Sequence, residues 1–317
     1  MSTQHSRSKL VTLTGVLLSA ALGLTACGGD DENDAQANTA APDVEITYEI
    51  SEDTEEVEID GELAMDEPAA WLISEGDGEP LEEGDLLHIL SADIDIQNQE
   101  INAHDFDLGG QTLQLSEEFE GLNPKAYETL VGAPTGSELA YYLPADTLGQ
   151  DTPAYLNIIA VEDTLATHAT GEPVDTAELN SALPEVTLDE ETQAPSIAEP
   201  EGEAPDELVV DVLKAGDGPE VQSGSKVTIQ YRGIKWSDGE EFDSSWGPDN
   251  TGSPTAFELR QLIAGWQEGL EGQQVGSQVI MSIPPELAYG EEDHELQDET
   301  LVFVIDILHT ADPVPAQ

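Results

Sequence analysis

The sequence is poor in cysteine and in basic residues. Cys27 is its only cysteine, which excludes a disulfide within the chain. Lysine and arginine together number 8 against 68 aspartates and glutamates among 317 residues, for a formal net charge of −60. Such a charge argues against nucleic acid and anionic lipid headgroups as partners. It indicates either adaptation to high salt or a solvated acidic surface with acidic linkers, and the concentration of acid in linker-like segments favours the second.

Motifs for metals, phosphates and nucleophiles are also missing. No Gly-rich phosphate loop, calcium loop of the EF-hand type or Ser–His–Asp signature is found. The histidines after the N-terminal segment lack metal-ligand spacing: His88, His104, His168, His294 and His309. The sequence therefore offers no candidate metal or cofactor site, and we expect no cofactor.

Long hydrophobic runs are absent except near the N-terminus. Residues 10–26 are apolar or small, a short basic region precedes them, and Leu24–Thr25–Ala26–Cys27 ends the run. This pattern is typical of a secretory signal peptide over residues 1–26 whose end resembles a bacterial lipobox, with Cys27 as the lipidated first residue. A plain signal peptide or a signal anchor are alternatives, although the run is short for spanning a bilayer. We expect a secreted protein that is lipid-anchored at Cys27 to the outer face of the bacterial cell membrane.

Two further segments are poor in large apolar residues. Residues 27–65 are acidic and predict a tether, although alternating apolar residues make a strand possible over 44–50. Residues 163–205 carry repeated prolines among Glu, Thr and Ala, and predict a disordered acidic linker. Two globular domains remain, over residues 66–162 and 206–311.

These two domains are repeats of each other. Gly76–Asp77–Gly78 precedes Gly216–Asp217–Gly218 by 140 positions (216 minus 76). The same offset joins Gly84 to Gly224, Leu130 to Leu270, Gly136 to Gly276 and Pro144 to Pro284. One constant offset over such a distance predicts a duplicated fold.

Hydrophobic periodicity predicts the fold of the second domain. Apolar residues alternate over 227–231, 279–283 and 301–307, which is the pattern of strands with one face on a core. Over 259–270 they follow helical spacing instead. We therefore expect an α+β fold in which a twisted antiparallel sheet is half wrapped around one short helix.

A series of motifs in this second domain is known from one protein family. In chain order they are Tyr231, Phe242–Asp243–Ser244–Ser245, Leu262–Ile263–Ala264–Gly265–Trp266, Ala288–Tyr289–Gly290 and Phe303. The series resembles the FKBP-type peptidyl-prolyl cis-trans isomerases over about a third of the chain. The resemblance implies two FKBP-like domains and an isomerase that assists the folding of exported proteins. It implies proline-containing polypeptides as partners, with macrolide immunosuppressant-type ligands as further candidates.

The resemblance also assigns roles to seven residues. An apolar pocket that strips water from the X–Pro carbonyl favours the twisted amide, in which resonance is lost. The same aromatics could instead be ordinary core. The implied roles are Trp266 as floor, Tyr231, Phe242 and Phe303 as walls, the Tyr289 hydroxyl and the Ile263 N–H as donors, and Asp243 beside the twisting carbonyl.

Two departures from the family pattern bear on activity. Residues 291–299, where the family has an apolar flap, are acidic, and only Leu296 could serve as an apolar wall. No Arg or Lys lies within 246–256, so Asp243 either lacks a basic partner or uses Arg260 or Arg232. The alternative function is therefore a peptide-binding or chaperone lipoprotein that keeps the pocket without turnover.

The first domain lacks the implied pocket residues. At the offset of 140, Trp266 corresponds to Ala126 and Tyr289 to Gly149, and we take Leu90 as the counterpart of Tyr231, while Phe106–Asp107 lies out of register with Phe242–Asp243. We expect this domain to be diverged and non-catalytic, a module that holds substrate or acts as a spacer.

Overall fold

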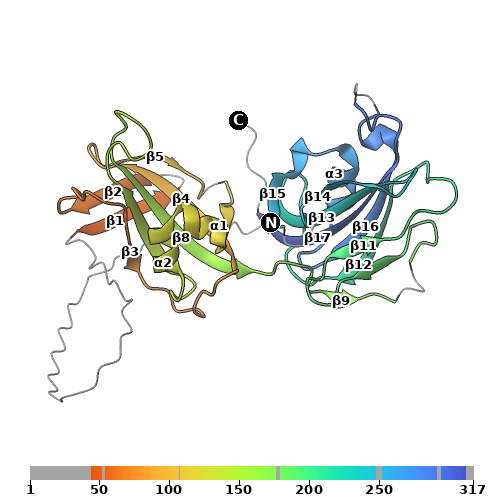
Figure 1. Cartoon of the computed structure of the whole chain (residues 1–317), viewed down its shortest axis with the longest axis horizontal. Helices are drawn as coiled ribbons and strands as arrows, with labels where there is room; N and C mark the ends of the chain where they lie inside the picture. The colour runs from red at the N-terminus through yellow and green to blue at the C-terminus, as the bar shows by residue number, and fades with distance from the viewer. Residues whose placement is uncertain are drawn as a thin grey trace, which may run out of the picture.

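The computed structural model describes residues 44–51, 54–106, 108–175, 179–247, 252–290 and 294–311. Two antiparallel sheets form two lobes that follow each other along the chain (Figure 1). Among the described residues, no helix has the length and apolar character needed to cross a bilayer. The expected signal peptide, Cys27 and flap residues 291–293 lie outside the described ranges.

The C-terminal lobe is the predicted sheet around a short helix. Its strand order is β14–β13–β17–β16–β12–β9, and β15 also pairs with β13. Helix α3 (Ala264–Leu270), preceded by the 3-10 turn η2 (Leu259–Gln261), packs on the inner face of the sheet over one apolar core. A second 3-10 turn, η3 (Pro285–Leu287), follows β16. The strands are β9 (Glu172–Pro173), β12 (Val209–Ala215), β13 (Lys226–Lys235), β14 (Glu241–Ser244), β15 (Thr255–Glu258), β16 (Gln278–Ile283) and β17 (Leu301–Ala311).

Close contact between helix and sheet depends on a glycine. A Cβ at Gly265 would lie 2.4 Å from Cγ2 of Ile283 on β16, closer than side-chain atoms can approach. The absence of a side chain at Gly265 therefore lets α3 lie flat on the sheet and present Trp266 to it.

The same sheet is buried on both faces, which the alternating pattern did not predict. In β17 the first eight residues are all buried. One set of alternate residues joins the core under α3, and the other set forms a second cluster on the outer face. The buried members of the outer cluster are Ile234, Trp236, Ile280, Val302 and Val304.

The segment that covers this outer face is the predicted disordered linker. Residues 163–175 and 179–205 are ordered instead: β9 adds to the sheet beside β12, and β10 (Val186–Leu188) pairs with β11 (Pro195–Ile197). Val186 and Ile197 pack against the outer cluster. Just before β9 in the sequence, the Ala169 N–H donates a hydrogen bond to the buried carboxylate of Asp306 at 2.9 Å. The segment packs here because Leu183, Val186, Ile197 and Ala204 meet an apolar sheet face that would otherwise be in water.

Apart from β9, the C-terminal lobe has the same strand order as the N-terminal lobe. The N-terminal sheet runs β5–β4–β8–β7–β3 with β6 on β4, as the other runs β14–β13–β17–β16–β12 with β15 on β13. The bounds of β4, α2 and β7 lie 140 positions before those of β13, α3 and β16, whereas β8 precedes β17 by 146 because the loop before it is shorter. The elements are β3 (Ala69–Ser74), β4 (Leu86–Asp95), β5 (Glu100–His104), β6 (Gln111–Gln114), α1 (Glu117–Leu122), α2 (Pro124–Leu130), β7 (Glu138–Leu143) and β8 (Tyr155–Leu165).

Part of the predicted tether also belongs to this lobe. β1 (Glu45–Ser51) and β2 (Thr54–Asp60) form a hairpin, which includes the strand that alternation made possible over 44–50. Ile46, Val57 and Ile59 of the hairpin are buried on the outer face of the sheet, in one cluster with Trp71 and Ile158. β10 and β11 lie 140 positions after parts of β1 and β2 and cover the corresponding face of the second lobe. Each lobe is therefore a sheet with helices inside and a hairpin outside.

The two lobes touch near β6 and β15. The rings of His88 on β4 and His309 on β17 lie 4.2 Å apart between centroids, tilted by 36°. The Lys226 ammonium donates to the Gly110 carbonyl, and the Ser253 hydroxyl donates to the Gln114 side chain. The contact is small and largely polar.

Candidate active site

Trp266 lies at the centre of a cluster of aromatic rings in the C-terminal lobe. Its ring centroid is 5.2 Å from that of Tyr231 and 5.0 Å from that of Phe303, at interplanar angles of 78° and 88°. Phe242 meets Phe303 edge to face at 5.5 Å. These are favourable edge-to-face arrangements. Four of the predicted pocket residues are thus brought together from four elements, namely β13, β14, α3 and β17.

A glycine on β13 makes room for two of these rings. A Cβ at Gly233 would lie 2.6 Å from Cε1 of Phe303 and 3.1 Å from Cε1 of Phe242. Gly233 and Phe303 are direct neighbours across the two strands. The ring of Phe303 therefore occupies the space of the missing side chain.

Asp243 has a defined partner in this cluster. The Tyr231 hydroxyl donates to Asp243 Oδ2 at 2.9 Å. Burial, followed by this hydrogen bond, raises the pKa of Tyr231 above its usual range, so the phenol stays protonated and able to donate. The two arginines considered as partners pair elsewhere: Arg232 with Glu241 at 2.8 Å and Arg260 with Glu258 at 3.1 Å. Asp243 itself is exposed and open to a ligand.

The remaining predicted residues lie at the edge of the same core. Ile263 is the N-cap of α3, where its carbonyl accepts from the Trp266 N–H at 3.0 Å. Tyr289 packs partly buried against the core and stacks on His294, with centroids 4.4 Å apart and planes 20° from parallel. Leu296 is buried in the core, as the sequence allowed for the only apolar residue of the flap segment.

Sequence reasoning missed Phe257. This residue of β15 places its ring 6.3 Å from both Tyr231 and Trp266, so it forms a further side of the cluster. The sequence held one indication of its role. Phenylalanine is rare in this chain, with only 5 in all, and three of them lie in this lobe at 242, 257 and 303. Its strand is short and carries no motif, and only the pairing of β15 with β13 brings it to Tyr231.

Strand pairing corrects one correspondence between the lobes. Tyr231 pairs with Ile305, and the residue in the same position of the N-terminal sheet is Ser91, which pairs with Ile159. The offset of 140 also gives position 91 (231 minus 140), so the prediction of Leu90 was a miscount by one residue, and Leu90 belongs to the opposite face of the sheet. The counterpart of Phe303 is Asn157.

Comparisons with known proteins agree on the C-terminal lobe. The family model described as FKBP-type peptidyl-prolyl cis-trans isomerase matches residues 218–308. A "Probable FK506-binding protein" of Corynebacterium glutamicum is 45% identical over 118 residues, which cover 37% of this chain and 98% of that protein. An FK506-binding protein of Streptomyces anulatus is 39% identical over 122 residues, covering 37% and 96%. The crystal structure of FkpA from Escherichia coli aligns over 34% of this chain and 49% of that one, with 35% identity and a TM-score of 0.31.

The two relatives are matched over nearly their whole length, and the matched region contains the aromatic cluster and Asp243. The chain therefore belongs to the FKBP-type peptidyl-prolyl cis-trans isomerases, and residues 218–308 are its family domain.

Proposed function

We propose that this isomerase acts on proline-containing segments of exported polypeptides through the aromatic cluster around Trp266. The observation that carries the proposal is the group of edge-to-face rings of Tyr231, Trp266 and Phe303, with the exposed Asp243 beside it. An apolar floor and walls suit a proline ring, and no nucleophile is needed for the reaction. The X–Pro bond has only to twist over a barrier of about 20 kcal/mol.

The pocket lowers this barrier by favouring the twisted amide over the planar one. In the planar amide the carbonyl oxygen carries more negative charge, which water stabilises. Aromatic walls remove that water, and each 1.4 kcal/mol of differential stabilisation raises the rate about tenfold. We assign the floor to Trp266 and the walls to Tyr231, Phe242 and Phe303.

Hydrogen-bonding groups at the rim orient the substrate in this proposal. The Ile263 N–H and the Tyr289 hydroxyl donate to substrate carbonyls. Asp243 lies next to the twisting carbonyl and acts on its charge without proton transfer. The Tyr231 hydroxyl keeps Asp243 in place by donating to it.

We further propose that the N-terminal lobe is a diverged FKBP-like domain without isomerase activity. Its strand order, which matches that of the C-terminal lobe apart from β9, supports the first part. Its pocket positions support the second: Ala126 stands where the other lobe has Trp266, and Asn157 where it has Phe303. Without an indole floor and the second ring, the proline ring has no apolar surface to pack on.

The location we propose is the outer face of the cell membrane, with a lipid on Cys27. The apolar residues 10–26 followed by Leu24–Thr25–Ala26–Cys27 support it. We expect Cys27→Ser to move the protein from the membrane fraction to the medium of a bacterial culture. Full retention of Cys27→Ser protein in the membrane fraction contradicts a lipid anchor.

The relatives named as FK506-binding suggest ligands of the macrolide immunosuppressant type for the same pocket. The experiment that tests the function is the isomerisation rate of an X–Pro tetrapeptide with the chain from residue 28 onward, with and without FK506. Catalysis that the macrolide inhibits supports the proposal. Binding of unfolded polypeptide without catalysis supports instead the alternative of a chaperone lipoprotein, which the acidic segment 294–299 keeps open.

A further inference from the structure

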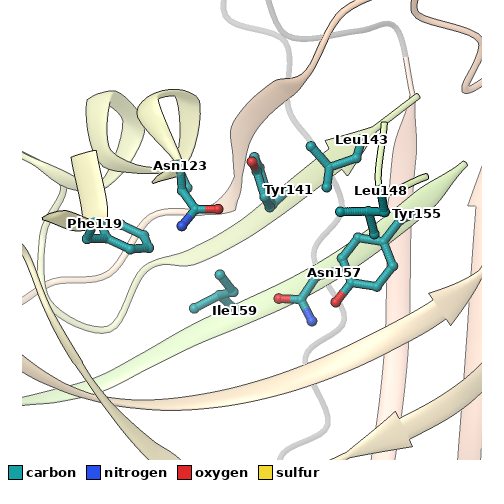
Figure 2. A pocket seen from close by; sticks show the side chains of 9 residues that line it. Phe119, Asn123, Tyr141, Leu143, Leu148, Tyr155, Asn157 and Ile159 are labelled. Carbon is teal, nitrogen blue, oxygen red and sulfur yellow. The ribbon is translucent and has the colours of Figure 1, made fainter. Parts of the chain in front are cut away.

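We propose that the N-terminal lobe contains a second polypeptide-binding site, which takes an extended segment with one bulky apolar side chain and does not require proline. The site is a cavity of about 400 Å³ between helices α1 and α2 and the inner face of the sheet (Figure 2). The proposal of a polypeptide ligand rests on the proposed function, whereas the cavity and its polar groups do not.

The cavity exists because a large side chain is missing. Ala126 on α2 occupies the position of Trp266 on α3, and the neighbouring side chains have not closed the space. Phe119, Leu143 and Ile159 form its apolar walls (Figure 2). Its volume falls in the range of about 300–1,000 Å³ that is usual for ligand pockets. Leu148 lies at its edge and is 64% exposed.

One side of the cavity carries a hydrogen-bonding group with spare capacity. Asn157 Nδ2 donates to Asp93 Oδ1 at 2.7 Å and to the Ala92 carbonyl at 3.2 Å, and the Tyr155 hydroxyl donates to the same carboxylate. These bonds use both hydrogens of the Asn157 amide and fix its orientation. Its carbonyl oxygen is left as an acceptor in the cavity.

The opposite side carries a second amide. Asn123 lies between α1 and α2 and is the N-cap of α2, yet its side chain makes no capping hydrogen bond. In Figure 2 this amide points from the helices toward the cavity. The other lobe has the apolar Ile263 at the same position. An amide that does not serve the helix is available to a ligand.

These groups match the chemistry of a peptide. A peptide unit offers one N–H and one carbonyl, which the Asn157 carbonyl and the Asn123 amide hydrogens complement, while the apolar walls take a side chain. The net charge of −60 and the carboxylate of Asp93 disfavour anionic ligands such as nucleotides. A segment held here raises the local concentration of its neighbouring prolines at the isomerase lobe of the same chain.

The test measures binding of a fluorescein-labelled, proline-free decapeptide with one central leucine, by fluorescence anisotropy. The protein is the chain from residue 28 onward with Trp266→Ala, so that the pocket of the C-terminal lobe is impaired. We expect saturable binding that Asn123→Ala weakens about two- to tenfold, as loss of one hydrogen bond should. Ala126→Trp should abolish binding by filling the cavity.

Leu122→Ala is the matched control, because Leu122 is 72% exposed, adjoins Asn123 and does not line the cavity. It should leave the affinity unchanged. Absence of binding, or equal affinity in Asn123→Ala and the control, overturns the proposal even if Ala126→Trp fails to fold. The X–Pro tetrapeptide assay on the chain without Trp266→Ala tests the isomerase function separately.

Discussion

At the residue scale, one indole distinguishes the aromatic cluster of the C-terminal lobe from the matched position in the N-terminal lobe. Trp266 is 5% exposed and touches Tyr231 and Phe303, whereas Ala126 leaves a cavity at the matched position. Burial of a large apolar side chain contributes roughly 1.5–3 kcal/mol. If the substrate ring loses that surface, we expect Trp266→Ala to lower kcat/KM for an X–Pro tetrapeptide by about ten- to hundredfold.

A control for this change is Trp236→Leu. Trp236 is buried on the outer face of the same sheet, so its loss costs stability without opening the pocket. Trp236→Leu should therefore lower the denaturant midpoint and leave kcat/KM for the tetrapeptide unchanged, whereas Trp266→Ala should lower kcat/KM. Full activity in Trp266→Ala protein is incompatible with the assigned floor.

The Tyr231–Asp243 hydrogen bond provides a second test at this scale. Tyr231→Phe keeps the ring contacts with Trp266 and removes only the hydroxyl that holds Asp243. A hydrogen bond of this kind contributes about 0.5–1.5 kcal/mol net. We expect a threefold to tenfold loss in kcat/KM from Tyr231→Phe alone, and no further loss when Tyr231→Phe is added to Asp243→Ala, because the hydroxyl acts through Asp243. Fully additive losses in the double variant would show that the two groups act independently.

At the scale of elements, the hairpin of β10 and β11 belongs to the C-terminal lobe. It covers Ile234, Trp236 and Val302, which would otherwise face water. A protein of residues 206–311 lacks this cover, whereas one of residues 166–311 keeps it. We expect the longer protein to be more stable by about 3 kcal/mol or more, since at least two large apolar side chains stay buried.

Urea unfolding of these two proteins measures the difference, and binding of an apolar dye reports the uncovered face. Limited proteolysis of the full chain gives an independent answer, because cleavage between 179 and 205 should be slow. Equal free energies of unfolding for the two proteins would mean that packing of the hairpin on the sheet does not stabilise the lobe.

The contact between the lobes predicts a pH dependence at the scale of the whole molecule. Burial, helped by His88 and Lys226 and opposed by Asp163, lowers the pKa of His309 from 6.5 to about 4. Between pH 4 and pH 6.5, the folded protein therefore binds fewer protons at His309 than the unfolded chain does. Stability from His309 is therefore present above pH 6.5 and lost as the pH falls toward 4.

Asp306 acts in the opposite direction over part of this range. Burial raises its pKa from 3.8 to about 6, so it favours the folded state as the pH falls from 6 to 3.8. His309→Asn isolates the histidine contribution. Urea unfolding at pH 4.5, 5.5 and 7 should show a smaller loss toward low pH in the variant, and parallel curves would exclude His309 as the source.

Much of this protein follows from local patterns in its sequence. Alternation over 227–231 and 301–307 predicted strands where they occur, because side-chain periodicity reflects the geometry of one element. Helical spacing over 259–270 predicted one helix, but only residues 264–270 form α3, after the 3-10 turn η2 over 259–261. The motifs around Trp266 and Asp243 pointed to the right family for the same reason, since each is short and contiguous.

Contacts between distant segments were decided by the tertiary structure alone. The packing of residues 179–205 depends on an apolar sheet face that is assembled from three other strands, so composition alone suggested disorder. Phe257 joins the cluster only through the pairing of β15 with β13, which its own sequence does not specify. The cavity beside Ala126 depends likewise on whether neighbouring side chains close over a missing indole, because packing is a property of the assembled core.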